Sequence, residues 1–164
     1  MLKRRNLLLA GAAGTAMVAV WRYSLPVATA ADKNFKVAHT DAEWRKLLSP
    51  PQYAVLRREG TERPHSSPLD NEHRPGTFAC AGCQHDLFAS EAKFDSGTGW
   101  PSFWKPLDNA VGETRDRSLG MERVSIHCAQ CGGHLGHVFD DGPKPTGLRY
   151  CMNGVAMIFT PRAA

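Results

Sequence analysis

The sequence predicts a mainly β domain of small antiparallel sheets, arranged as a sandwich or a barrel, with short helices on its N-terminal side. From residue 77 onward the apolar residues form short or alternating runs, and glycine and proline separate these runs at short intervals. This pattern is typical of antiparallel strands joined by tight turns, and not of strand–helix–strand units. The 164 residues, 42% hydrophobic and 22% charged, suffice for one domain with a modest core.

Two short helices are expected ahead of the strands. Residues 40–43 read Thr-Asp-Ala-Glu and fit a capping box, in which the threonine hydroxyl and the glutamate carboxylate each accept a hydrogen bond from a free backbone N–H. Residues 49–52 read Ser-Pro-Pro-Gln and repeat this start signal. The second helix should stop at Gly60, and the first should place on one face Trp44, Leu47 and Leu48.

A loop and then six strands should follow the helices. Residues 61–76 are rich in proline, serine and glycine and poor in apolar residues, which predicts a loop or an extended segment. The expected strands cover residues 77–80, 86–89, 122–127, 137–139, 149–152 and 155–159.

Residues 1–30 resemble a targeting segment. A basic start precedes an apolar run over residues 7–20, and residues 28–30 form a small-x-small cleavage pattern. The run is short for a membrane span, and the pair Arg4-Arg5 resembles a twin-arginine signal, which exports folded proteins. We therefore expect export, to the periplasm of a bacterium, with residues 31–164 as the single mature domain and no stable membrane insertion after cleavage. A general secretory signal and an uncleaved anchor remain alternatives.

The net charge of +4 comes from this first segment. Four of the 20 basic residues lie within residues 1–30, which contain no acidic residue, so the rest of the chain has 16 basic and 16 acidic side chains. A neutral body lacks the general attraction to phosphate on which nucleic-acid binding depends. We therefore expect no nucleic-acid partner.

Four of the five cysteines form two Cys-x-x-Cys pairs, which predict a structural zinc site. The pairs are Cys80 with Cys83 and Cys128 with Cys131, each in a turn of small residues. Four thiolates close the tetrahedral coordination sphere of Zn²⁺, so the metal would be structural and not catalytic. Two disulfides, the usual state of cysteines in exported proteins, and a ligand set that includes His134 or His137 are the alternatives. Folding around zinc before twin-arginine export would reconcile the metal with export.

The fifth cysteine, Cys151, is the candidate nucleophile. It lies two residues from Arg149 and two from Asn153. A neighbouring cation stabilises thiolate over thiol, and the thiolate is the reactive form. We therefore interpret the rest of the domain as the scaffold of a pocket around Cys151.

Two further segments could supply the wall and the acid of this pocket. Residues 94–104 combine glycines with large aromatics, so Trp100, and with it Phe103, could contact an apolar or sulfur-containing ligand. Alternation along the strand at residues 137–139 would place His137 and Phe139 on one face. Two histidines and two aspartates lie within residues 134–141, a pattern that indicates a proton donor held by a carboxylate. The alternatives are that the aromatic residues simply belong to the hydrophobic core, and that the histidine is a structural residue whose hydrogen bonds are satisfied.

These residues resemble the methionine-R-sulfoxide reductase family. The matching stretches are residues 61–64, 80–83, 93–103, 128–143 and 148–153, and the likeness extends over about residues 44–159. The resemblance implies two small antiparallel sheets, a zinc site remote from catalysis, and reduction of the R epimer of methionine sulfoxide, free or in proteins. It also implies one role for each matching residue: Cys151 as nucleophile, Trp100 at the substrate methyl, His137 and His134 around the sulfoxide oxygen, and Asp141, Arg149 and Asn153 as supporting polar groups.

The chain departs from many family members at Thr98, where they have a resolving cysteine. With four thiols on zinc, a sulfenic acid at Cys151 would then need an external thiol, such as a thioredoxin-like protein. A monomer is expected. The rival hypotheses are an exported zinc-ribbon interaction module, a disulfide-stapled secreted protein and a thiol peroxidase.

Overall fold

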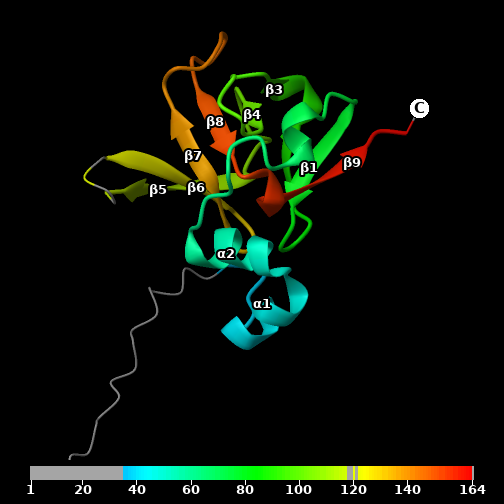
Figure 1. The fold of residues 1–164 in the computed structure, drawn as a ribbon, viewed down its shortest axis with the longest axis vertical. Helices are drawn as coiled ribbons and strands as arrows, with labels where there is room; N and C mark the ends of the chain where they lie inside the picture. The colour runs from blue at the N-terminus through cyan, green and yellow to red at the C-terminus, as the bar shows by residue number, and fades with distance from the viewer. Residues whose placement is uncertain (1–34, 118–119, 121, 164) are drawn as a thin grey trace, which may run out of the picture. The chain divides into compact units, whose positions relative to one another are not determined.

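A computed structural model describes residues 35–117, 120 and 122–163, all of which belong to one compact unit (Figure 1). The described chain is mainly β, with one sheet of three strands and one of six, both antiparallel. The predicted fold class is therefore confirmed. The predicted signal segment, residues 1–30, lies outside the described residues.

Both predicted helices are present, and both begin at the predicted caps. Helix α1 (Asp41–Leu47) and helix α2 (Pro50–Arg58) each start with a complete capping box. The prediction of a shared apolar face was wrong for Leu47, whose side chain is 59% exposed, whereas Trp44 and Leu48 are buried. Leu48 reaches the core because it is the C-cap and its backbone is already extended.

Sheet A contains β1 (Gly76–Cys80), β2 (Asp86–Ala89) and β9 (Met157–Pro161), in the order β2-β1-β9. Its three strands were all expected. The last strand starts later than predicted, since Gly154–Ala156 form a 3-10 turn, η4. Two further 3-10 turns are η1 (Pro68–Asn71) and η2 (Ser90–Ala92).

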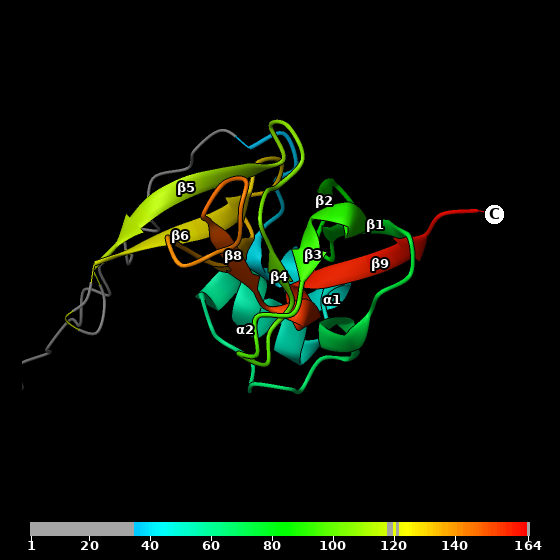
Figure 2. The ribbon, with the colours of Figure 1, turned by 90° about the horizontal axis from the view of Figure 1, so that it is seen from above.

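Sheet B has the strand order β3-β4-β8-β7-β6-β5. Its strands are β3 (Lys93–Phe94), β4 (Ser102–Phe103), β5 (Val111–Asp116), β6 (Arg123–Cys128), β7 (His134–Phe139) and β8 (Arg149–Met152). Strands β3, β4 and β5 were not predicted. Two of them are only two residues long, and β5 is mostly polar because it forms the exposed edge beside β6, which reaches away from β1 and β9 (Figure 2).

The two sheets are joined by an aromatic core. Phe103 of β4 stacks on Phe88 of β2 with ring centroids 4.3 Å apart and meets Phe78 of β1 edge-on at 5.0 Å. All three side chains are fully buried. Tyr150 and Met152 of β8 also face this core. Because side chains alternate along a strand, the neighbouring residues Arg149 and Cys151 face the other way.

None of the helices among the described residues is long and apolar enough to cross a membrane.

Candidate functional site

Strand register brings the candidate nucleophile and the candidate acid together. Cys151 on β8 pairs with Ser102 on β4 and with His137 on β7, and His137 pairs in turn with Ser125 on β6. Directly paired residues in an antiparallel sheet point to the same face, with Cβ atoms about 4.5–5.5 Å apart. Four strands therefore place one row of side chains across the face of sheet B that points away from the aromatic core.

A cavity of about 170 Å³ opens on this row. Five of the predicted site residues line it, from three separate segments of the chain: Trp100, His137, Phe139, Cys151 and Asn153. Thr61, Arg123 and Gly136 complete the lining. A Cβ at Gly136 would lie within the backbone of Cys151 and Met152, so β7 and β8 can approach here only because this residue is glycine.

Cys151 is half-buried at this cavity, and its surroundings shift the pKa of its thiol in opposite directions. Burial raises the pKa of the Cys151 thiol, whereas the hydroxyl of Thr98, 3.9 Å from the sulfur, and the charge of Arg149 act to lower it. The net shift of the pKa is upward, although Arg149 acts in the expected direction and lowers it. Loss of water around the sulfur outweighs one nearby guanidinium.

His137 is held by a carboxylate, but not by the expected one. Its Nε2 lies 2.9 Å from Oδ2 of Asp116 on β5, and the same oxygen accepts a hydrogen bond of 2.7 Å from Arg123 on β6. The pattern pointed to one of two aspartates, Asp140 and Asp141, and Asp141 instead forms a two-point ion pair with Arg149 at 2.8 Å for each bond. Asp116 was missed because β5 was not recognised as a strand.

His134 lies behind His137 and not in the cavity lining. The two rings are 5.3 Å apart, and Nδ1 of His134 lies 3.0 Å from the Ser125 hydroxyl. Burial, and next the charge of His137, lower the pKa of His134 to about 4. His134 is therefore uncharged at neutral pH and cannot serve as an imidazolium acid there.

Arg149 contacts both a lining residue of the cavity, Phe139, and an exposed carboxylate, Asp141. Its guanidinium lies over the ring of Phe139, 4.4 Å from the centroid, while Asp141 holds its far side. The side chain of Asp141 is largely exposed and that of Arg149 is largely buried. Asp141 thus fixes Arg149, and Arg149 covers Phe139.

Glu62 fixes two of the lining residues. Its carbonyl accepts a hydrogen bond from Nε1 of Trp100 at 3.2 Å, and its backbone N–H donates to Oδ1 of Asn153 at 2.9 Å. The amide of Asn153 also donates to the carbonyl of Leu135 at 3.0 Å. The indole ring and the Asn153 amide are therefore both held in place by backbone groups.

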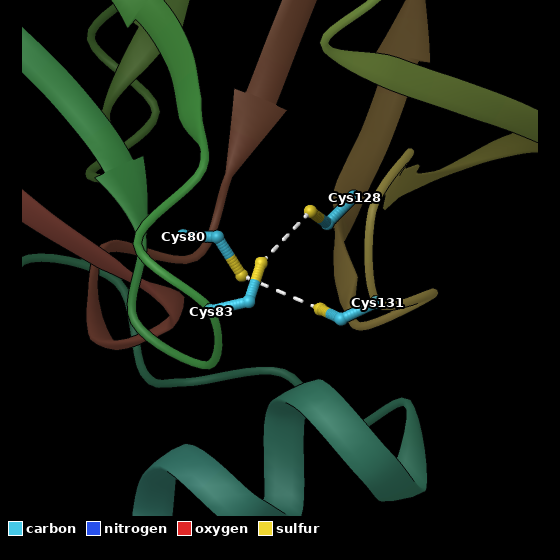
Figure 3. A group of neighbouring side chains, drawn as sticks. All are labelled: Cys80, Cys83, Cys128 and Cys131. Carbon is cyan, nitrogen blue, oxygen red and sulfur yellow. Dashed lines mark hydrogen bonds between the residues drawn. The ribbon is translucent and has the colours of Figure 1, made fainter. Parts of the chain in front are cut away.

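The four paired cysteines form one cluster at the turn after β1 and the turn after β6 (Figure 3). Their sulfurs all lie within 4.8 Å of one another, with Cys80 and Cys131 3.7 Å apart and Cys83 and Cys128 3.5 Å apart. A disulfide needs about 2.05 Å, whereas four sulfurs about 2.3 Å from a tetrahedral metal lie about 3.8 Å apart. The cluster therefore fits a metal ion and not two disulfides, and all five cysteines are free thiols.

Deprotonation of the whole cluster would need a compensating cation. Hydrogen bonds from the neighbouring sulfurs, that of Cys128 above all, raise the pKa of Cys80 far above its ordinary value. Four thiolates cannot coexist at this spacing without a positive ion to compensate them. The backbone N–H of Gly82 already points at the Cys80 sulfur, at 3.4 Å.

Comparison with known proteins identifies the family. Residues 48–161 match the SelR domain family. The chain belongs to this family. Proteins named peptide methionine sulfoxide reductase MsrB are similar to it over most of their length. The relative from Bradyrhizobium diazoefficiens is 53% identical over 84% of this chain and 100% of its own. Those from Agrobacterium fabrum and Pseudomonas putida are 55% and 56% identical, over 77% of this chain and 94% and 96% of theirs.

Within this SelR domain, the metal cluster and the cavity lie at different ends of β7. The strand starts at His134, directly after the second cysteine turn, and lines the cavity from Gly136 onward, about 7 Å further on at the usual rise per residue. A metal in the cluster could therefore fix the start of β7 without contacting a ligand beside Cys151.

Among the aromatic residues predicted to contact the substrate, Phe103 is the one that the SelR domain places elsewhere. It is fully buried between Phe78 and Phe88 and does not line the cavity. Its neighbour Ser102 faces Cys151 instead, because side chains alternate along β4. The residues that sequence reasoning missed are Thr61, Asp116 and Arg123. The signal available for the last two was their opposite charge within eight residues of the sequence.

Proposed function

We propose that the chain reduces methionine-R-sulfoxide, free or within a polypeptide, to methionine, with Cys151 as the nucleophile. The observation that supports this most is that the one thiol outside the metal cluster lies in a cavity beside His137 and Trp100. Membership of the SelR family, with relatives named peptide methionine sulfoxide reductase, supports the same reaction.

The cavity lining suits a methyl sulfoxide. Trp100 and Phe139 offer aromatic surface to the methyl group and the sulfur, a contact of about 0.3–1.5 kcal/mol for sulfur on an aromatic ring. His137 offers a donor for the oxygen, and Asp116 holds its ring in position. Arg149 acts from behind the lining by covering Phe139, and Asn153, itself part of the lining, fixes the chain next to Thr61.

In the proposed mechanism the Cys151 thiolate attacks the sulfoxide sulfur while His137 protonates the oxygen. This step forms a bond between Sγ of Cys151 and the substrate sulfur, which still carries the hydroxyl group. The hydroxyl group then moves to Sγ as its bond to the substrate sulfur and the new sulfur–sulfur bond both break, so that methionine leaves and Cys151 becomes a sulfenic acid. Two electrons pass from Cys151 to the substrate sulfur. We assign the proton to His137 and not to His134, since His134 is buried, neutral and outside the lining.

An external thiol would complete the cycle. Thr98 occupies the position nearest Cys151 on the glycine-rich turn, and the other four sulfurs belong to the metal cluster. One thiol of a thioredoxin-like protein would form a mixed disulfide with Cys151 and release water, and a second thiol would then release reduced Cys151.

Zn²⁺ is the metal we propose for Cys80, Cys83, Cys128 and Cys131. When bound, it would supply a structural cross-link and no chemistry on the substrate, since four thiolates leave no open coordination position. The export of the chain through a twin-arginine-type signal at residues 1–30 is likewise proposed, on the sequence pattern alone. Folding around zinc before export would protect the thiols from oxidation.

The test uses the two separated epimers of methionine sulfoxide with the wild-type protein and with Cys151→Ser. We expect turnover of the R epimer alone and its complete loss in the variant, with the metal content unchanged. Peroxide as an alternative oxidant distinguishes a thiol peroxidase, and nucleic-acid binding at low salt distinguishes an interaction module. Turnover that persists without the Cys151 sulfur would refute the proposal.

A further inference from the structure

A second hollow adjoins the Cys151 cavity. It is a groove of about 740 Å³ between α2 and η1 on one side and η4 and β9 on the other. Thr61 lines both the groove and the cavity, and the consecutive residues Asn153 and Gly154 line one each. The two hollows therefore border the same two segments, residues 61–62 and 153–154, so a polypeptide bound in the cavity could extend across these segments into the groove.

The lining of the groove is mainly apolar. Val55, Leu69, Val155, Ile158 and Phe159 contribute side chains to it. Ile158 is 39% exposed and is one of two large hydrophobic side chains exposed in the described part of the chain. An exposed apolar surface next to a binding cavity indicates a contact surface for a ligand.

The charge of the groove selects against acidic ligands. Glu62 is the one charged residue in the described lining, and no Lys or Arg accompanies it there. Its carboxylate accepts hydrogen bonds from the backbone N–H of Gly154 and, at 3.1 Å, from that of Val155. An acidic side chain at the Glu62 end of the groove would lie near this carboxylate, whereas the neighbouring cation, Arg74, lies over the ring of Phe159 on β9.

We propose that the groove binds apolar side chains of the polypeptide that flank the methionine sulfoxide. The proposal rests on the proposed function and deepens it, because it assigns the substrate as a polypeptide segment with an apolar flank. An extended chain advances about 3.3 Å per residue, so residues one to three positions from the sulfoxide can reach the groove. A second copy of this chain is the competing occupant.

The test compares capped peptides of equal length in which methionine sulfoxide is flanked by leucine, serine or glutamate, on either side. N-acetyl-methionine sulfoxide serves as the substrate without flanks. We expect leucine on one side to raise kcat/KM about tenfold over serine, the selectivity that an apolar pocket usually gives. Glutamate on that side should give the lowest kcat/KM of the three peptides.

A matched pair of variants distinguishes an effect of the groove from the general effect of replacing an exposed hydrophobic side chain by a charged one. Ile158→Asp changes the groove, whereas Leu47→Asp changes the other exposed hydrophobic side chain, which lines neither hollow. Ile158→Asp should abolish the leucine preference by raising KM, with kcat and the turnover of N-acetyl-methionine sulfoxide unchanged. Leu47→Asp should retain the preference.

Two results would overturn the proposal while the proposed function stands. The first is normal turnover of N-acetyl-methionine sulfoxide with equal kcat/KM for the leucine and serine peptides. The second is a fall in molecular mass with Ile158→Asp and no change in peptide kinetics, which would assign the groove to a second copy of the chain. Failure of every substrate, including the small one, would instead refute the proposed function.

Discussion

Replacing Cys83 with serine should destabilise the domain while leaving Cys151 untouched. Cys83 is the informative ligand because it is only partly buried, so a serine hydroxyl there can reach water. Serine at the fully buried Cys80 would add the cost of burying an unpaired hydroxyl and would confuse the interpretation. The substitution removes one of the four sulfurs that connect the turn after β1 in sheet A with the turn after β6 in sheet B.

The expected loss of stability follows from the binding free energy of the metal. A structural Zn²⁺ site in small peptides contributes about 10–16 kcal/mol of apparent binding free energy, and whole domains are stable by about 5–15 kcal/mol. Loss of a quarter of the metal contribution, about 3 kcal/mol, is therefore a large part of the free energy of unfolding. With about 1–3 kcal/mol per molar urea, the midpoint should fall by at least about 1 M.

The assay is urea unfolding under reducing conditions, combined with metal analysis of the same samples. Cys83→Ser should bind zinc more weakly and unfold at lower urea, and a chelator, which removes the whole metal contribution, should lower the midpoint of the wild type at least as far. Cys151→Ser is the matched control, because it removes the fifth sulfur from outside the cluster. Its zinc content should be unchanged and its stability should stay within about 0.5 kcal/mol of the wild type.

The reasoning fails if Cys83→Ser keeps the wild-type midpoint, or if the reduced wild type has the same midpoint with and without zinc. Either result would mean that the four sulfurs do not hold a stabilising metal. Two disulfides between them would be the remaining explanation, and thiol titration would detect these directly.

Two further predictions concern Cys151. Thr98→Cys should form an internal disulfide with Cys151 after one turnover, since the side chain of residue 98 lies 3.9 Å from the Cys151 sulfur. Mass spectrometry should then find that the variant has lost about 2 Da, whereas the sulfenic acid of the wild type adds about 16 Da. A persistent sulfenic acid in the variant would contradict this prediction. Alkylation of Cys151 by iodoacetamide should still be rising at pH values where a free cysteine levels off, because burial raises its pKa and leaves less thiolate at any lower pH. Arg149→Gln should shift the profile further up, and a plateau below pH 8 would contradict the assignment.

Local features were predictable because neighbours in the sequence decide them. Both capping boxes form between residues three positions apart, so their side chains can meet only if the helix starts there. The cysteine pairs indicated a metal site because two residues between cysteines make a turn that presents both sulfurs to one ion. Cys151 was recognised as the candidate nucleophile because the other four cysteines form these two pairs. Alternation correctly placed His137 and Phe139 on one face.

The sequence by itself thus determined the strand-rich fold, the helix starts, the four-sulfur cluster and the isolated Cys151. Tertiary structure alone decided that Asp116 and not Asp141 reaches His137, because this contact depends on the pairing of β5, β6 and β7. It also decided that Phe103 faces the core, that burial outweighs Arg149 at Cys151, and that a groove and the cavity both border Thr61. Register, burial and cavities arise from contacts between segments far apart in the chain, and local sequence patterns do not specify these contacts.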